Sequence, residues 1–304
     1  CPEELHTALG TENIGKLLMQ YAVPAIIAMT ASSLYNMVDS IFIGHGVGTM
    51  AISGLALTFP LMNLAAAFGS LVGVGAATLI SVKLGQKDYD TAQRVLGNVF
   101  VLNILLGVAF TVVVMAFLDP ILYFFGGSDE TVGYARDYMQ IILLGNAVTH
   151  LYLGLNAVLR SSGHPQKAMY ATIATVIINT ILDPVFIYGF GWGIRGAAIA
   201  TVAAQLISTV GCFLYAFVKY PKLRLHREDW QVTLGDMRRH LGQGIPLGLQ
   251  FSVLAIGIIV MQSVVVKFDI LEGEMISNAA QNGFGAANKL NNLLMTPMNG
   301  LGTA

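Results

Sequence analysis

Two aspartates lie inside apolar stretches that are long enough to cross a bilayer. Asp39 belongs to the first apolar run of the chain, and Asp183 belongs to the segment Asn179-Thr-Ile-Leu-Asp183-Pro184. A carboxylate at mid-membrane depth costs about 2.5 to 3.5 kcal/mol on insertion scales, so such residues usually mark ion or proton pathways. The placement of the two acids therefore indicates a transport function.

The segment around Asp183 has the chemistry of a small cation site. Asn179 and Asp183 are separated by one helical turn and share a helix face. Pro184 cannot donate a hydrogen bond to the Thr180 carbonyl, and it disfavours helical geometry at Asp183, so a helix break is expected here. A carboxylate, an amide oxygen and a free carbonyl are ligands that a hard cation such as Na⁺ prefers. The alternative is a packed kink in which Asp183 is protonated and hydrogen-bonded.

The first apolar run repeats this pattern. Tyr35, Asn36 and Asp39 share one helix face, and Pro24 is expected to kink the same helix several turns earlier. If Asp39 and Asp183 face one cavity, their mutual repulsion favours a shared proton, which would bind reversibly. We therefore predict an H⁺ or Na⁺ site, with a possible Na⁺ at Asp39, Asn179 and Asp183. The alternative for Asp39 is a solvated residue at the membrane boundary.

Five further polar residues lie on the expected spans. Tyr134 and Tyr138 form one i, i+4 pair, and Thr201 and Gln205 form another, so each pair could complete a cation shell or hydrogen-bond the acids. The alternatives are interfacial aromatic residues and hydrogen bonds between helices. Lys289 lies in the last apolar run and must reach water, snorkel or pair with an acid, so it could line a substrate path.

The composition indicates that lipid is the solvent of most of this chain. The 304 residues are 55% hydrophobic and 11% charged, with mean hydropathy +0.67, whereas a soluble domain is about one quarter charged. Because a spanning helix needs about 20 apolar residues, spans are expected at residues 14–43, 52–82, 94–118, 134–159, 166–189, 195–218, 244–267 and 276–304. The net charge of −1 does not indicate a nucleic-acid-binding surface. Two cysteines cannot build a disulfide framework or a cysteine-based metal site.

Charge and a faint repeat indicate the domain organisation. Most of the 16 Lys and Arg residues lie in loops on one side, which predicts a cytoplasmic N-terminus. Tyr21-Ala-Val-Pro24 and Gln243-Gly-Ile-Pro246 each open a long apolar run, which is typical of two parallel-repeat lobes. We expect a cytoplasmic N-terminal segment, a first lobe of helices 1–6, a cytoplasmic linker, and helices 7–8 of a truncated second lobe, at residues 1–13, 14–218, 219–243 and 244–304. The sequence is interpreted as a fragment of a longer protein.

Three motifs together give a family resemblance. At Asn179-x-x-x-Asp183-Pro184-x-Phe186-Ile187, Tyr35-Asn-x-x-Asp39 and Gly196-Ala-Ala-Ile-Ala-Thr201, the chain resembles the multidrug and toxic compound extrusion (MATE) family. It looks most like the DinF-type branch of bacteria and archaea. The resemblance covers the whole chain and implies an all-α, polytopic membrane bundle of two six-helix lobes, of which helices 1 to about 8 are present.

The resemblance also implies an activity and a site. Members of the family export organic, often cationic, compounds in exchange for H⁺ or Na⁺, and need no cofactor besides that ion. The implied partners are small organic molecules and the lipid bilayer, and a monomer in the inner (cytoplasmic) membrane is expected. In the DinF-type branch the ion site combines acids, an amide, a phenol and a hydroxyl of the first lobe, which carry over to Asp39, Asn179, Asp183, Tyr138 and Thr201.

The sequence fits two other functions less well. A lipid-linked sugar flippase or polysaccharide exporter of the same superfamily would need an arginine-rich cavity for pyrophosphate. Here Arg160 and Arg195 lie at helix ends instead. A membrane enzyme is not expected, because the sequence has no His-Glu-x-x-His motif and no Ser/His/Asp set at one depth.

Overall fold

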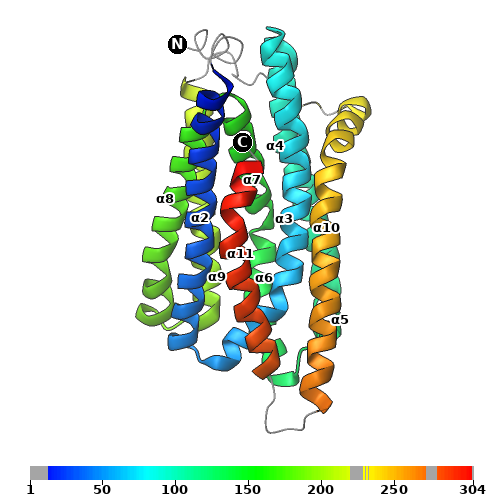
Figure 1. Cartoon of the computed structure of the whole chain (residues 1–304). Helices are drawn as coiled ribbons and strands as arrows, with labels where there is room; N and C mark the ends of the chain where they lie inside the picture. Colours follow the sequence, from blue (N-terminus) through cyan, green and yellow to red (C-terminus); the bar gives the residue numbers. More distant parts are fainter. Residues whose placement is uncertain (1–12, 220–228, 230, 232, 272–278, 303–304) are drawn as a thin grey trace.

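The fold is a bundle of long helices (Figure 1). The computed structural model describes residues 13–219, 229, 231, 233–271 and 279–302, and every regular element in that part of the chain is helical. This confirms the expected all-α membrane class. The elements are α2 (Ile14–Gly46), α3 (Thr49–Gly85), α4 (Tyr89–Ala116), α5 (Leu118–Phe124), α6 (Asp129–Leu144), α7 (Asn146–Ser161), α8 (Pro165–Pro184), the π-helix η1 (Val185–Gly189), α9 (Gly193–Lys219), α10 (Leu234–Leu271) and α11 (Ala279–Gly302).

Six segments of the described chain are long and apolar enough to cross a membrane. They are Ile14–Gly46, Thr49–Gly85, Tyr89–Ala116, Pro165–Gly189, Gly193–Cys212 and Gly248–Val265. α6 and α7 meet at an angle of 58° and count as a seventh span if the bent pair crosses as one. The expected span at 276–304 coincides with α11, which forms a helix but is not among these six segments.

Several helices begin earlier than their apolar runs, because polar side chains cap their ends. The Asp88 carboxylate accepts a hydrogen bond from the Thr91 backbone N–H at 3.3 Å, so α4 begins at Tyr89. The hydrogen bonds from Thr91 and the ion pair with Lys83 at 3.1 Å lower the pKa of Asp88. Ser128 starts α6 with a capping box.

The expected linker at 219–243 is partly helical. α10 begins at Leu234, so the second half of that stretch belongs to this helix, and α9 ends at Lys219. The linker residues 220–228, 230 and 232 lie outside the described residues. The division into two lobes stays a prediction.

Small residues let the helices approach closely. A Cβ added to Gly73 of α3 would lie 2.9 Å from the Cα of Gly154 on α7, and one added to Gly244 of α10 would lie 1.9 Å from the Leu71 carbonyl oxygen on α3. α10 therefore packs along α3. Figure 1 shows α11 between α2 and α10, and it contacts both helices. The two helices expected to open the second lobe thus lie against the first two spans of the first lobe.

Candidate ion-binding site

Four helices bring the five residues of the predicted ion site together in the interior of the bundle. α2 carries Asp39, α6 carries Tyr138, α8 carries Asn179 and Asp183, and α9 carries Thr201. All five are buried, and the two acids are 4% and 0% exposed, respectively. α8 packs against both α2 and α9, and α6 packs against α9, so the backbone contacts of these helices position the site.

Asn179 connects the helices of the site. Its side-chain oxygen accepts a hydrogen bond from the Thr201 backbone N–H at 3.0 Å. Its side-chain nitrogen donates to Asp183 Oδ2 at 3.1 Å and to the Tyr35 hydroxyl at 3.2 Å. This orientation pairs every amide donor with an acceptor, which a buried polar group requires. Asn179 therefore fixes the position of the Asp183 carboxyl relative to α2 and α9.

Tyr35 belongs to this network. Thr201 Oγ1 donates to the Ala197 carbonyl at 3.1 Å, so its oxygen is left to accept a hydrogen bond from the Tyr35 hydroxyl at 2.9 Å. Tyr138 approaches the same threonine from α6 and acts electrostatically on both acids. The structure thus places Tyr35, which the sequence put only on the helix face of Asp39, among the hydrogen-bonding residues of the site.

The two acids face each other across the interface between α2 and α8. Asp39 and Asp183 are close enough for their carboxyl groups to share a hydrogen bond, and Asp39 Oδ1 has no hydrogen-bond partner among the described residues. Two carboxylates in such contact repel each other unless a proton or cation lies between them. An unpartnered carboxylate oxygen beside a second acid and an amide therefore fits either a proton or a small hard cation such as Na⁺.

The burial of the acids excludes one of the two interpretations that the sequence left open for Asp39. Asp39 is 4% exposed, so the interpretation of this residue as solvated at the membrane boundary is wrong. Asp183 is both fully buried and hydrogen-bonded to Asn179. Two interpretations of Asp183, as an ion-binding residue and as a protonated residue in a packed kink, both require this buried, hydrogen-bonded environment. A functional test distinguishes them.

The expected helix break at Asp183-Pro184 takes the form of a change of helix type. α8 is α-helical through Asp183 and ends at Pro184, where the chain continues directly into the π-helix η1. In η1 the Phe190 N–H donates to the Val185 carbonyl at 2.9 Å, which is the i to i+5 spacing of a π-helix. The Tyr188 hydroxyl in η1 then donates to the Phe42 carbonyl on α2 at 2.9 Å. This bond links the segment after Asp183 to the turn of α2 that follows Asp39.

Three polar residues that share a helix face with a predicted site residue lie outside the site. Asn36 is exposed, and its backbone carbonyl accepts a hydrogen bond from Ser40 Oγ. Gln205 Oε1 accepts from the Thr149 hydroxyl at 2.5 Å, which is the inter-helix hydrogen bond that the sequence left as an alternative. Tyr134 is half-buried beside Gly54 of α3. An i, i+4 pair specifies a helix face, but it does not specify which of its two members reaches a neighbouring helix.

Lys289 of α11 points into the bundle rather than to its ends. Its ammonium donates a hydrogen bond to Ser40 Oγ and lies 5.1 Å from the ring centroid of Phe59. The three residues line a cavity of about 420 Å³ between α2, α3 and α11. Ser40 was not marked by the sequence; its position next to Asp39 within an apolar span was the available signal.

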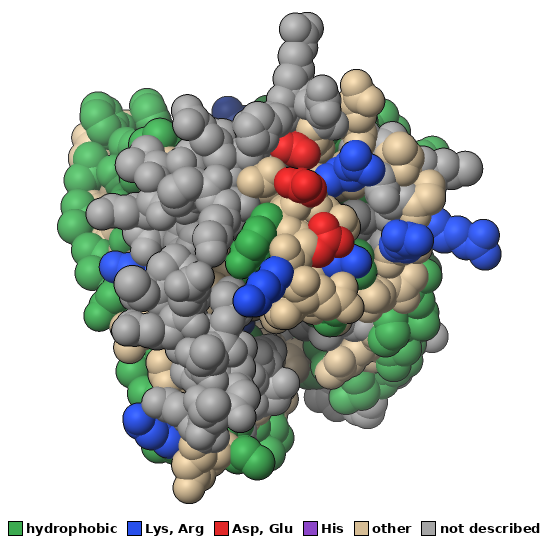
Figure 2. All heavy atoms as spheres, turned by 90° about the horizontal axis from the view of Figure 1, so that it is seen from above, with side chains coloured by type: hydrophobic (Ala, Val, Ile, Leu, Met, Phe, Trp, Pro, Cys, Tyr) green, Lys and Arg blue, Asp and Glu red, His purple; other side chains and the backbone are tan. Residues whose placement is uncertain are grey.

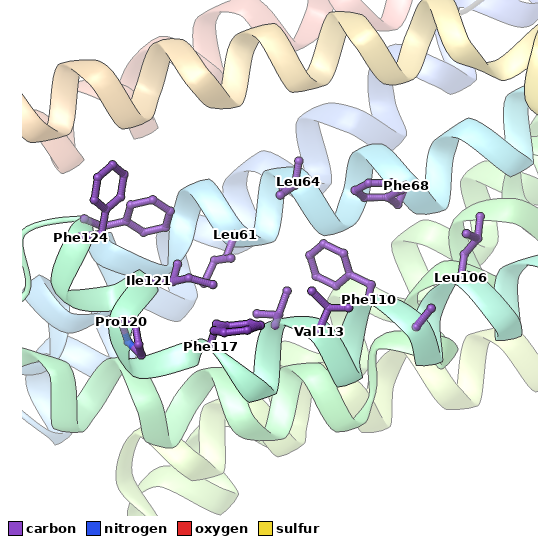
Figure 3. Close-up of a pocket in the computed structure, with 13 residues that line it drawn as sticks. Leu61, Leu64, Phe68, Leu106, Phe110, Val113, Phe117, Pro120, Ile121 and Phe124 are labelled. Carbon is purple, nitrogen blue, oxygen red and sulfur yellow. The ribbon is translucent and has the colours of Figure 1, made fainter.

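A larger cavity of about 690 Å³ lies away from the acids. Figure 3 shows its walls, which come from α3, α4 and α5 and include Phe68, Phe110 and Phe117. Every residue that lines it is apolar. It therefore offers no group that could bind an ion. Among the described residues, no cluster of three or more His, Cys, Asp or Glu side chains could hold a metal ion.

The spans and the buried polar site define a multi-pass membrane protein with a buried polar core. Residues 24–185, more than half of the chain, match the sequence profile of the MatE family, and the chain belongs to this family. The DinF-type branch stays a prediction.

The relatives of this chain are export proteins. It is 30% identical over 244 residues to the multidrug export protein MepA of Staphylococcus haemolyticus (strain JCSC1435), covering 80% of this chain and 54% of the relative. MepA of Staphylococcus aureus (strain NCTC 8325 / PS 47) is 32% identical over 200 residues, which are 66% of this chain and 44% of that protein. The chain thus spans about half the length of these curated relatives.

Solved transporter structures share the fold of this chain. A MOP superfamily transporter from Pyrococcus furiosus superposes with a TM-score of 0.82 at 25% identity, covering 94% of this chain and 62% of that one. The relatives are transporters, which confirms the expectation that the family is not one of enzymes.

Proposed function

We propose that the complete protein is a secondary active antiporter that exports small organic compounds in exchange for H⁺ or Na⁺. The observation that carries the proposal is the pair of buried acids, Asp39 and Asp183, in a chain of the MatE family. The name of MepA, a multidrug export protein, supports organic compounds as the exported class. The site residues that we assign to ion binding are Asp39, Asn179, Asp183, Tyr138 and Thr201.

The coupling ion acts on the α2–α8 interface. Without an ion, two carboxylates in contact repel each other and favour a looser packing of α2 against α8. A proton or Na⁺ removes the repulsion and favours the closer packing. Because an ion can shift an equilibrium only by its differential affinity for the two states, this change at the interface is the step that would couple ion binding to alternating access. Helix α2 would then adopt two forms that differ in its bend, with Pro24 as the bending point.

The charges at the two ends of the bundle support a cytoplasmic N-terminus. Figure 2 shows Lys and Arg side chains on the end that carries the start of α2 and the α3–α4 junction. At the opposite end Arg136 and Arg195 are each paired with an acid, at 2.6 and 2.7 Å. Lys and Arg residues in short loops are enriched on the cytoplasmic side of membrane proteins. We accordingly assign the protein to the cytoplasmic membrane, as a monomer because one chain supplies the whole ion site.

Uptake by inverted vesicles tests the proposal. The complete protein is reconstituted, and accumulation of a fluorescent organic compound is followed under a proton gradient and, separately, under a sodium gradient. Accumulation driven by one gradient is expected and identifies the coupling ion. Accumulation that ignores both gradients would refute the antiport mechanism and favour the flippase alternative.

Tyr138→Phe is expected to slow gradient-driven uptake about tenfold. Tyr138 is 2% exposed and faces both acids, and loss of a buried hydroxyl from such a network costs about 1.4 kcal/mol. Tyr134→Phe, one turn earlier on the same helix and outside the site, is the matched control and should transport at the wild-type rate. Equal effects of the two substitutions on initial uptake rates would remove Tyr138 from the site.

A further inference from the structure

The cavity between α2, α3 and α11 contains a charged group that the proposed ion site does not use. Its volume is about 420 Å³, and its walls are mostly apolar, with Ser40, His45 and Lys289 as the polar residues. A cavity of about 300 to 1,000 Å³ with apolar walls and a few convergent polar groups is typical of sites for small organic ligands. The larger cavity in Figure 3 lacks such polar groups.

The Lys289 ammonium has unused hydrogen-bonding capacity. It carries three N–H donors, and one of them is bonded to Ser40 Oγ. Ser40 gives its own hydrogen to the Asn36 carbonyl at 2.8 Å, so it accepts from Lys289 and cannot donate. The Phe59 ring covers one further side of the ammonium. Two donors therefore remain for a ligand on the cavity side.

Within the part of the chain that the structure describes, no acid lies in direct contact with the Lys289 ammonium, and Lys289 forms no ion pair. Asp39 acts on Lys289 only at longer range, and it faces Asp183 instead. A cation held among apolar walls without a contacting anion is costly, so an incoming anion gains more there than at a surface lysine.

We infer that this cavity binds organic compounds that carry an anionic group, such as an aromatic carboxylate, with the anion at Lys289 and the ring beside Phe59. The carboxylate accepts the two remaining ammonium hydrogen bonds, and the apolar walls accommodate the aromatic body. An organic cation in the same orientation would place two positive charges together in an apolar cavity, which disfavours it. The inference rests on the proposed function only in taking the bound compound as a transported substrate, and it differs from the cationic substrates that the family resemblance implies.

Calorimetric titration of the complete protein in detergent tests the inference. The probes share one ring system and differ in charge: naphthalene carboxylate, naphthalene carboxamide and naphthylmethylammonium. The wild-type protein is expected to bind the carboxylate about tenfold more tightly than the carboxamide, because charge-assisted hydrogen bonds are about twice as strong as neutral ones, and to bind the ammonium compound most weakly. Equal affinities, or a preference for the ammonium compound, would overturn the inference.

Substitutions at Lys289 then assign the preference to this residue. Lys289→Met keeps the length of the side chain and should lower carboxylate affinity about tenfold while changing carboxamide affinity less than about twofold. Lys289→Arg should keep the preference, and Lys83→Met, at the distant α3–α4 junction, is the surface control. A preference that survives Lys289→Met, or one that Lys83→Met removes equally, would place the anion elsewhere.

The titration is independent of ion coupling. It uses no membrane and no gradient, so a failure of the antiport proposal leaves its result unchanged. Conversely, driven uptake with no selectivity for the carboxylate would support antiport and refute the role of Lys289. The wild-type comparison of the three probes decides the question even if Lys289→Met does not fold.

Discussion

Asp183→Asn is expected to slow gradient-driven uptake about a hundredfold. The substitution keeps the shape of the side chain and its contact with Asn179, but it removes the charge that binds a proton or Na⁺. Losing a contact between a buried charge and its ion costs about 3 kcal/mol, and each 1.4 kcal/mol is a factor of ten. The measurement is the initial rate of uptake by inverted vesicles under the driving gradient.

Asp137→Asn is the matched control for this substitution. Asp137 is an acid of the same chain that pairs with Arg195 at an exposed position, where an ion pair contributes at most about 1 kcal/mol. It should therefore transport at close to the wild-type rate. Driven uptake that survives Asp183→Asn would return Asp183 to the role of a packed, protonated residue in a kink.

Gly244→Ala is expected to destabilise the protein by about 2 to 3 kcal/mol. The added methyl group would lie 1.9 Å from the Leu71 backbone oxygen, and a backbone atom cannot move aside without shifting α10 away from α3. Gly248, one turn later, faces the Leu71 side chain. A shift of α10 away from α3 would therefore also loosen the packing of Gly248 against Leu71. The expected fall in melting temperature in detergent is about 5 to 10 °C.

Gly257→Ala on the same helix separates this effect from helix propensity. A Cβ at Gly257 meets no atom within 4 Å, so the substitution adds a methyl group in open space. Its melting temperature should match the wild type or rise slightly, because alanine favours a helix over glycine. If both variants melt at the same temperature, the close approach of α10 to α3 contributes nothing to stability.

The sequence predicted that most of the candidate-site residues would come together, because they obey helical periodicity. Asn179 and Asp183 lie one turn apart, and burial of an acid in an apolar run limits where it can point. The resemblance to the family added Tyr138 and Thr201, which periodicity alone left open against Tyr134 and Gln205. The choice depends on how α6 and α9 are rotated against their neighbours, which a single sequence does not specify.

The sequence did not predict other features of the structure, because they depend on the geometry of helix ends and on the packing between helices. The helix ends at Tyr89 and Leu234 differ from the edges of the apolar runs, because capping residues and polar turns extend helices beyond the lipid. Pro184 was expected to break α8; the α-helix ends there, but the chain stays helical and continues as the π-helix η1. The position of Lys289 next to Ser40 depends on the packing of α11 against α2, between residues that are distant in the sequence.

Infrared difference spectroscopy of the complete protein tests the central claim most directly, because it detects the protonation of single carboxyl groups. The claim is that Asp39 and Asp183 together bind the coupling ion. Lowering the pH, or removing Na⁺, should increase the carbonyl band of a protonated carboxyl group in the wild type, and the double variant Asp39→Asn/Asp183→Asn should lose that change. The same band change in the double variant would show that the coupling ion binds at other residues.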